Sequence, residues 1–173
     1  MTSRDVFAAL YELHYDEIHA FCARRVGREA AGDVTAEVFT VVWRRRDDIP
    51  PGIERAWIFG VARRLIQNQW RSASRRERLL QKVRGQRPSK VGDPETALAD
   101  SDRVRVALSL LRPDDQEILR LAAWDDLTGP EIAEVLDITL AATQQRLSRA
   151  KRRLATALTA LDGEPDDEWE VSR

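Results

Sequence analysis

Apolar side chains recur every three or four residues along most of the chain, and this spacing is typical of amphipathic helices. The first apolar stretch begins near Ser3 and ends at Gly27, and a second stretch ends in the sequence DDIPPG at residues 47–52. Paired prolines and a glycine cannot continue a helix, so we expect a third helix to begin near Glu54. No stretch alternates apolar and polar residues as a half-buried strand does. The pattern therefore predicts an all-α fold.

A change of composition divides the chain into two helical blocks. Residues 81–100 contain glycine and proline but few large apolar side chains, which predicts a flexible linker. We therefore expect one small helical domain at residues 1–80 and a second at residues 101–161. Residues 162–173 carry six acidic side chains against one arginine, and this composition predicts a disordered acidic tail. The alternative is that this acidic tail folds back on a basic surface of the chain or binds a partner.

The second block contains a helix-turn-helix pattern. Thr128 and Glu131 have the spacing of a capping box, and Pro130 stands early in the helix, where its missing N–H does no harm. The short helix ends near Leu136, a three-residue turn follows, and a long helix begins at Leu140. Such a pair of helices can place its second member in the major groove of DNA.

Basic residues are concentrated in two stretches of the chain. The net charge is −1, but residues 55–90 hold eleven basic residues and one acid, and residues 140–154 hold five basic residues and no acid. Two separate stretches of this kind favour a polyanion as the ligand. The alternative is that each is a solvated helix face.

Other functional classes lack support in the sequence. The single cysteine, Cys22, excludes an internal disulfide framework and a multi-cysteine zinc site. No base-and-nucleophile pair and no metal-ligand spacing is visible, so we expect no catalysis, no metal and no cofactor. No apolar run is long enough to span a membrane and no signal peptide is visible, so we expect a cytoplasmic protein with no membrane insertion.

The long basic helix carries side chains of the types that can read duplex DNA. Ala142 is small enough for the helix to approach base edges closely, glutamines can bond adenine, and arginines can bond guanine or phosphates. The candidate contacts are Thr139, Ala142, Gln144, Gln145, Arg146, Arg149 and Arg153. The alternative is an ordinary helical hairpin with a basic exposed face.

Five segments from both blocks sharpen this interpretation when they are taken together. They are DVTAEVFTVVWR at 33–44, AWIFGVARRL at 56–65, LRPDDQEIL at 111–119, EIAEVL at 131–136 and RLSRAKRRL at 146–154. In this order and spacing they resemble a group IV (extracytoplasmic function) sigma factor of bacterial RNA polymerase. The resemblance covers residues 6–161 and implies two helical domains, sigma2 and sigma4. It also implies three partners, namely core RNA polymerase through its beta and beta-prime subunits, promoter DNA, and an anti-sigma factor.

The resemblance also assigns roles to residues of the first block. It implies that Asp33, Glu37 and Arg44 dock on a coiled coil of the beta-prime subunit, although both acids could instead favour the helix N-terminus through its dipole. The loop at 45–55 and the third helix would melt the minus-ten element and capture a flipped base, with residues 49–54 shaping the pocket. The candidate contacts there are Arg63, Arg64, Asn68, Trp70 and Arg71.

Four aromatic or apolar residues lie close in sequence to the residues assigned to polymerase docking, and their character favours a place in the protein core. We expect Val34, Val38, Phe39 and Trp43 to belong to the core rather than to an interface. Trp57 is also expected to be packed, whereas Trp70 is open between a stacking platform and a core position.

Several residues depart from the family's usual pattern. Arg64, Asn68 and Gln69 make the minus-ten face more basic, and Gln144 replaces a common lysine. Thr143 replaces a core valine, so its buried hydroxyl should bond back to the preceding helical turn. Two other functions remain to be distinguished: a stand-alone helix-turn-helix regulator, which leaves the first block unexplained, and a helical adaptor that binds acidic proteins.

Overall fold

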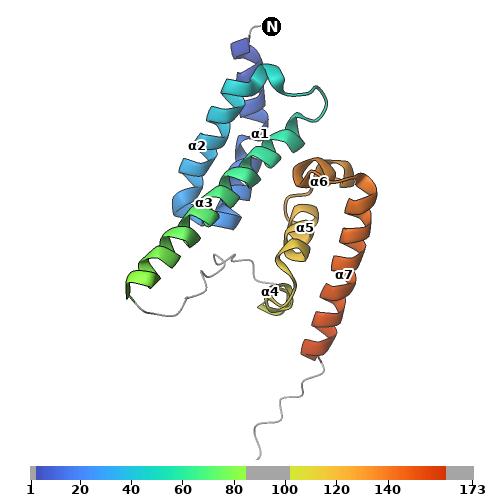
Figure 1. Ribbon diagram of the computed structural model, residues 1–173. Coiled ribbons are helices and arrows are strands. Elements are labelled where there is room, and N and C mark those ends of the chain that lie inside the picture. The colour runs from blue at the N-terminus through green and yellow to red at the C-terminus, as the bar shows by residue number, and fades with distance from the viewer. Residues whose placement is uncertain (1–2, 85–101, 163–173) are drawn as a thin grey trace, which may run out of the picture. The chain divides into compact units, whose positions relative to one another are not determined.

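The computed structural model describes residues 3–84 and 102–162, and the chain divides into two compact units. All elements in these two ranges are helical, so the all-α prediction is confirmed for the part of the chain that the structure describes (Figure 1).

The first unit is a bundle of three helices. It consists of α1 (Ser3–Val26), α2 (Arg28–Arg45), the short 3-10 helix η1 (Arg46–Asp48) and α3 (Glu54–Arg84). Each of the three long helices packs against the other two. The last turns of α3 extend past the ends of α1 and α2 (Figure 1). Because α3 ends at Arg84, it includes the first four residues of the predicted linker, 81–84.

The second unit contains α4 (Asp102–Ser109), α5 (Pro113–Ala123), the first part of α6 (Gly129–Leu136), and α7 (Leu140–Asp162). The long α7 packs against both α4 and α5. Residues 85–100 of the predicted linker lie outside the described residues, and so does the predicted acidic tail apart from Asp162, which belongs to α7.

Gly27 allows α1 to end and α2 to begin within one residue. Its φ of 83° lies in the left-handed region that glycine adopts without strain. The Gly27 N–H still donates to the Ala23 carbonyl of α1 at 3.1 Å, and the Gly27 carbonyl already accepts from the Ala31 N–H of α2 at 3.1 Å. The predicted helix end at Gly27 is therefore confirmed, and the tight reversal lets α1 and α2 lie side by side.

The core of the first unit comes from one apolar stripe on each helix. The edge of the Phe21 ring meets the Phe59 ring at 5.1 Å between centroids, and both rings are fully buried. Smaller apolar side chains at three- and four-residue spacing extend these stripes, and they include Ile18, Cys22, Val34, Val38, Val42, Ile58, Ala62 and Ile66. Cys22 is thus a packed core residue, as its position in the apolar pattern of the first helix indicates.

We predict that Phe21→Ala destabilises the first unit by about 3–5 kcal/mol, because the substitution leaves a cavity facing Phe59. The measurement is urea unfolding followed by tryptophan fluorescence in a Trp124→Phe, Trp169→Phe background, in which every remaining tryptophan lies in α2 or α3. Leu13→Ala on the same helix is the control, since Leu13 is 73% exposed and should change stability by less than about 0.5 kcal/mol. Equal losses from both substitutions would contradict this core.

Candidate nucleic-acid and partner interfaces

The outer face of α2 carries the three residues assigned to the polymerase. Val34, Val38 and Val42 are buried at four-residue spacing. Because successive residues of a helix are rotated by about 100°, the residues at positions 33, 37 and 44 share the face opposite this stripe. Asp33, Glu37 and Arg44 are all exposed there.

The position of the two acids in α2 bears on the alternative explanation for them. The helix begins at Arg28, and the acid of its first turn is Glu29. Dipole stabilisation is confined to the first helical turn, whereas Asp33 and Glu37 lie in the second and third turns. Their placement is therefore not explained by the helix N-terminus, and their docking role stays a prediction.

Trp43 lies at the edge of the first unit rather than inside it. Its ring meets Phe7 edge-on at 5.1 Å between centroids, and the guanidinium of Arg46 stacks over it at 4.4 Å. The residue nevertheless remains 40% exposed. The core prediction is confirmed for Val34, Val38 and Phe39, but it is only partly right for Trp43, because Phe7 and Arg46 together cover only part of its side chain.

The five minus-ten candidates on α3 divide between two faces. Arg64, Asn68 and Arg71 follow one another at spacings of four and three, so they share one exposed face opposite the buried Ile58, Ala62 and Ile66. Arg63 and Trp70 are seven residues apart and share a neighbouring face, where Arg63 is half-buried. The structure therefore brings together three of the five candidates on one face of α3, and the other two lie on a neighbouring face of the same helix.

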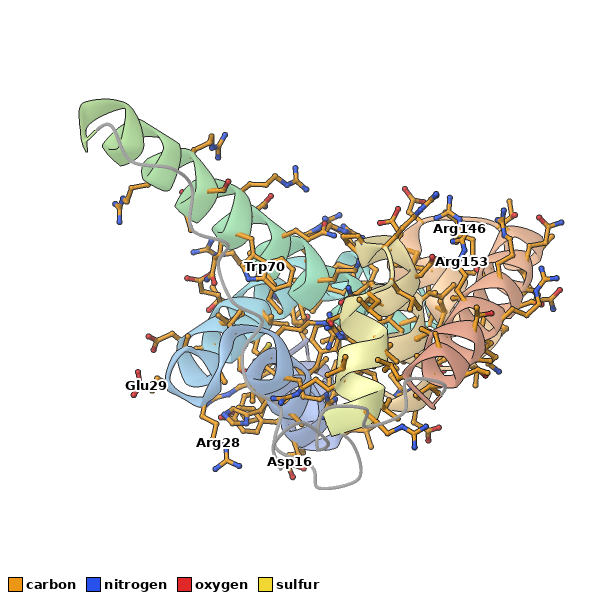
Figure 2. The ribbon with its side chains drawn as sticks, turned by 90° about the horizontal axis from the view of Figure 1, so that it is seen from below. Asp16, Arg28, Glu29, Trp70, Arg146 and Arg153 are labelled. Atoms are coloured by element: carbon orange, nitrogen blue, oxygen red, sulfur yellow. The ribbon has the colours of Figure 1, made fainter. Side chains whose placement is uncertain are left out.

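The two tryptophans of α3 differ in exposure. Trp57 is only 9% exposed and packs under the guanidinium of Arg45 at 5.7 Å, so the prediction that it is packed is confirmed. Trp70, which is labelled in Figure 2, is 45% exposed, so part of its side chain is open to an external ligand. The structure thus favours the platform over the core position for Trp70.

The loop before α3 is held by backbone and side-chain contacts. Gly52 adopts a φ of 86°, and its N–H donates to Glu54 Oε2 at 2.9 Å. The Ile53 carbonyl accepts from the Trp57 N–H at 2.8 Å, which begins α3. Arg55 then ties this end of α3 to α1 by donating from Nε to Glu17 Oε2 at 3.0 Å. The predicted base-capturing loop therefore enters α3 in a defined conformation.

Hydrogen bonds fix both helices of the helix-turn-helix pair. The Thr128 N–H donates to Glu131 Oε2 at 2.8 Å, which is the backbone half of the predicted capping box. Asp137 closes α6 with a φ of 54°. Thr139 then caps α7, because its Oγ1 accepts from the Ala142 N–H at 3.1 Å. Thr143 is fully buried and its hydroxyl donates to the Thr139 carbonyl at 3.1 Å, as its burial predicts.

The candidates on α7 also occupy more than one face. Ala142, Arg146, Arg149 and Arg153 are spaced by four, three and four residues and form one stripe. Arg146 and Arg153, seven residues apart, lie on the same side of α7 (Figure 2). Arg153 also forms an ion pair with Asp115 of α5, so this residue of the stripe connects α7 to α5.

A second exposed face of α7 holds the two glutamines. Gln144, Gln145, Ser148, Arg149 and Arg152 line one shallow hollow. Neither Ser148 nor Arg152 is among the seven contacts predicted for this helix. Their spacing from Gln145 by three and seven residues is the signal that places them on this face.

The remaining candidate features concern metals and membranes. In the part of the chain that the structure describes, no three His, Cys, Asp or Glu side chains are grouped so that they could hold a metal ion. No helix within residues 3–84 and 102–162 combines the length and the apolar character that a membrane span requires.

Comparison with known families matches both units. Residues 10–76 match Sigma-70 region 2, and residues 101–154 match region 4 of Sigma-70, so the two matches together cover more than half of the chain.

Curated relatives and solved structures agree with these matches. The sigma factor CnrH of Cupriavidus metallidurans is 27% identical over 74% of this chain and 73% of its own length, and YlaC of Bacillus subtilis is 28% identical over 92% and 95%. The fold is similar to that of RpoE in its complex with the anti-sigma factor NepR from Bartonella quintana, with 22% identity, a TM-score of 0.63, and coverage of 88% of this chain and 96% of that one. It is also similar to CnrH in complex with the cytosolic domain of CnrY, with 24% identity, a TM-score of 0.57, and coverage of 89% and 88%.

The chain belongs to the extracytoplasmic function group of the sigma-70 family. It is a sigma factor, and it directs promoter-specific initiation of transcription by RNA polymerase. A stand-alone regulator is not favoured, because the region 2 match accounts for the first unit that such a regulator leaves unexplained.

We predict that Glu54 stabilises the loop before α3 only above acidic pH. The backbone N–H of Gly52, followed by its own backbone N–H, lowers the pKa of Glu54 below its ordinary value. A lowered folded-state pKa gives stability that is complete above the unfolded pKa and is lost as pH falls through the folded pKa. The stability difference between the wild type and Glu54→Gln, measured by urea unfolding, should therefore shrink as the solution is acidified. A difference that grows on acidification would contradict this role.

Proposed function

We propose that this sigma factor assigns one exposed helix face to each of its partners. The outer face of α2 docks on the beta-prime subunit, the outer face of α3 holds the opened minus-ten strand, and α7 reads duplex DNA upstream. The observation that carries the proposal is the exposure of Asp33, Glu37 and Arg44 on the side of α2 opposite its buried valines. Exposed charges aligned on one face suit recognition of a charged partner surface.

The proposed minus-ten contact combines two kinds of interaction. Arg64 and Arg71 flank Asn68 on one exposed face of α3, where the guanidinium groups can neutralise phosphates and the amide can bond a base edge. The exposed part of Trp70 supplies a ring on which an unstacked base can rest. Stacking on an aromatic ring and backbone neutralisation together offset the cost of unstacking.

The proposed duplex contact lies on α7. The capped N-terminus of this helix presents Gln144, Gln145 and Arg146 to base edges, and Arg149 with Arg152 reaches the phosphates. Each unit alone offers few contacts. Tethered on one polymerase, the two units bind two promoter elements at once, so the second contact forms at a raised effective concentration.

The remaining assignments follow from this role. The polymerase performs the chemistry, so the chain itself is not an enzyme and needs no cofactor. Its place of action is the cytoplasm, where promoters are. The solved structures of RpoE and CnrH contain an anti-sigma factor or the cytosolic domain of CnrY, and an anti-sigma factor is likewise a proposed partner of this chain.

Run-off transcription with purified core polymerase and a genomic promoter library tests the proposal. The wild-type chain should select a set of promoters. Asn68→Ala and Trp70→Ala should lower open-complex formation on those promoters without weakening the binding of the chain to core polymerase. If neither substitution affects opening, α3 does not hold the strand as proposed.

We predict that Glu37→Lys weakens the binding of the chain to core polymerase by at least about tenfold, because it reverses one charge at the centre of the proposed docking face. The measurement is a titration of labelled chain with core enzyme. Asp16→Lys is the matched control, since Asp16 is an exposed acid on α1 (Figure 2) and should leave the affinity unchanged. Equal effects of the two reversals would remove α2 as the docking face.

We predict that Arg149→Ala weakens duplex binding by the holoenzyme by about 1–3 kcal/mol and lowers the dependence of log K on log salt by about one unit if the contact is to a phosphate. Holoenzyme binding to the upstream element at several salt concentrations measures both quantities. Arg28→Ala removes an exposed arginine from the other unit and is the control. An unchanged affinity in the Arg149 variant would contradict a duplex contact at this position.

A further inference from the structure

A groove in the second unit adjoins the faces of α7 described so far and shares Arg149, Arg152 and Arg153 with them. It has a volume of about 670 Å³ and runs between the end of α4, the start of α5 and the C-terminal half of α7. Its lining residues, all from this unit, are Leu110, Leu111, Arg112, Asp115, Arg149, Arg152, Arg153, Thr156, Ala157 and Ala160.

The groove combines an apolar floor with an excess of positive charge. Leu110 is 65% exposed in it, although leucine is a residue that folded chains usually cover. Of the four arginines that line the groove, Arg153 is paired with Asp115. Within residues 3–84 and 102–162, the guanidinium groups of Arg112 and Arg152 have no acidic partner, and Arg149 bonds only the Gln145 carbonyl. The groove therefore suits an acidic segment that also carries a large apolar side chain.

The chain itself contains such a segment directly after α7. Residues 163–173 read GEPDDEWEVSR, with five acids, one tryptophan and one valine. The segment starts at the end of the groove, because Ala157 and Ala160 lie in the last turns of α7. The segment begins with a glycine and contains a proline, Gly163 and Pro165, which are residue types that favour turns.

The length of the segment is sufficient to reach the arginines. Along α7, the distance from Asp162 back to Arg149 is about 20 Å at 1.5 Å per residue. Eleven extended residues span up to about 36 Å. A segment that turns back after Asp162 can therefore bring Glu168 and Glu170 to Arg152 and Arg149, with Trp169 against Leu110.

We propose that residues 163–173 occupy this groove and compete with DNA for Arg149 and Arg152. The tether keeps the segment at an effective concentration in the millimolar range, so a weak contact is enough to fill the groove. Opposite charges supply the attraction, and burial of Trp169 and Leu110 adds apolar contact area. The competition with DNA rests on the duplex contact proposed for α7, whereas the occupancy of the groove does not.

The direct test of occupancy compares amide NMR spectra of the full chain and of a chain that ends at Asp162, without DNA. We expect shifts at the groove residues, from 110 to 115 and from 149 to 160, and few elsewhere. Arg152→Ala in the full chain should move these signals toward the shortened chain, whereas Lys151→Ala, an exposed neighbour outside the groove lining, should not. Spectra that differ only at the last turn of α7 would overturn the proposal.

A second variant separates docking from simple charge repulsion. Trp169→Ala keeps all five acids, and it should shift the groove signals at least halfway toward those of the shortened chain. If the acids act only through long-range repulsion, this substitution leaves the spectrum of the groove unchanged, and the docked arrangement is wrong.

The competition with DNA has its own readout. At low salt, removal of residues 163–173 should raise the affinity of the free chain for duplex DNA by three- to tenfold, and changing the five acids to their amides should do the same. Unchanged affinity together with groove shifts would retain the docking and overturn the competition. If neither chain binds duplex, the duplex contact proposed for α7 in the free chain fails, while the NMR result still decides the docking.

Discussion

The rotation of each helix about its own axis is the constraint on which the remaining structure depends. Val34, Val38 and Val42 are buried on one side of α2, and this packing leaves Asp33, Glu37 and Arg44 on the other. A shift of one residue in the apolar pattern would turn the outer face by about 100° and would bring charges against the core. The same relation holds on α3, where buried Ile58, Ala62 and Ile66 set the direction of Arg64, Asn68 and Arg71.

Polar contacts complement this packing in the second unit. The buried Thr143 satisfies its hydroxyl within α7, and the Thr139 cap fixes where the helix begins. The Asp115–Arg153 ion pair joins α5 to α7, so an arginine that the sequence assigns to DNA also holds the scaffold. Arg149 and Arg152 line both the hollow that carries the glutamines and the neighbouring groove, which links proposed DNA binding to proposed occupancy of that groove.

Local patterns in the sequence predicted the features that depend on near neighbours. The helix end at Gly27, the back-bonded Thr143 and the backbone half of the Thr128–Glu131 box all involve residues within a few positions of one another. The contact of Arg153 with Asp115 spans 38 positions, and no local pattern could identify it. The exposure of Trp43 likewise depends on how much of its ring Phe7 covers. The extension of α3 to Arg84 was missed because the glycine and proline content of residues 81–100 predicted a linker from its first residue, although residues 81–84 (QKVR) contain neither and precede Gly85.

Photo-crosslinking from two positions in one open complex tests the account most directly. A photoreactive residue replaces Asn68 on the outer face of α3 or Ser148 on the outer face of α7, and the complex forms on a promoter selected by run-off transcription. The account predicts that position 68 crosslinks to the opened strand at the minus-ten element, and that position 148 crosslinks to the upstream duplex. Crosslinks from both positions to the same element, or from neither position to DNA, would contradict it.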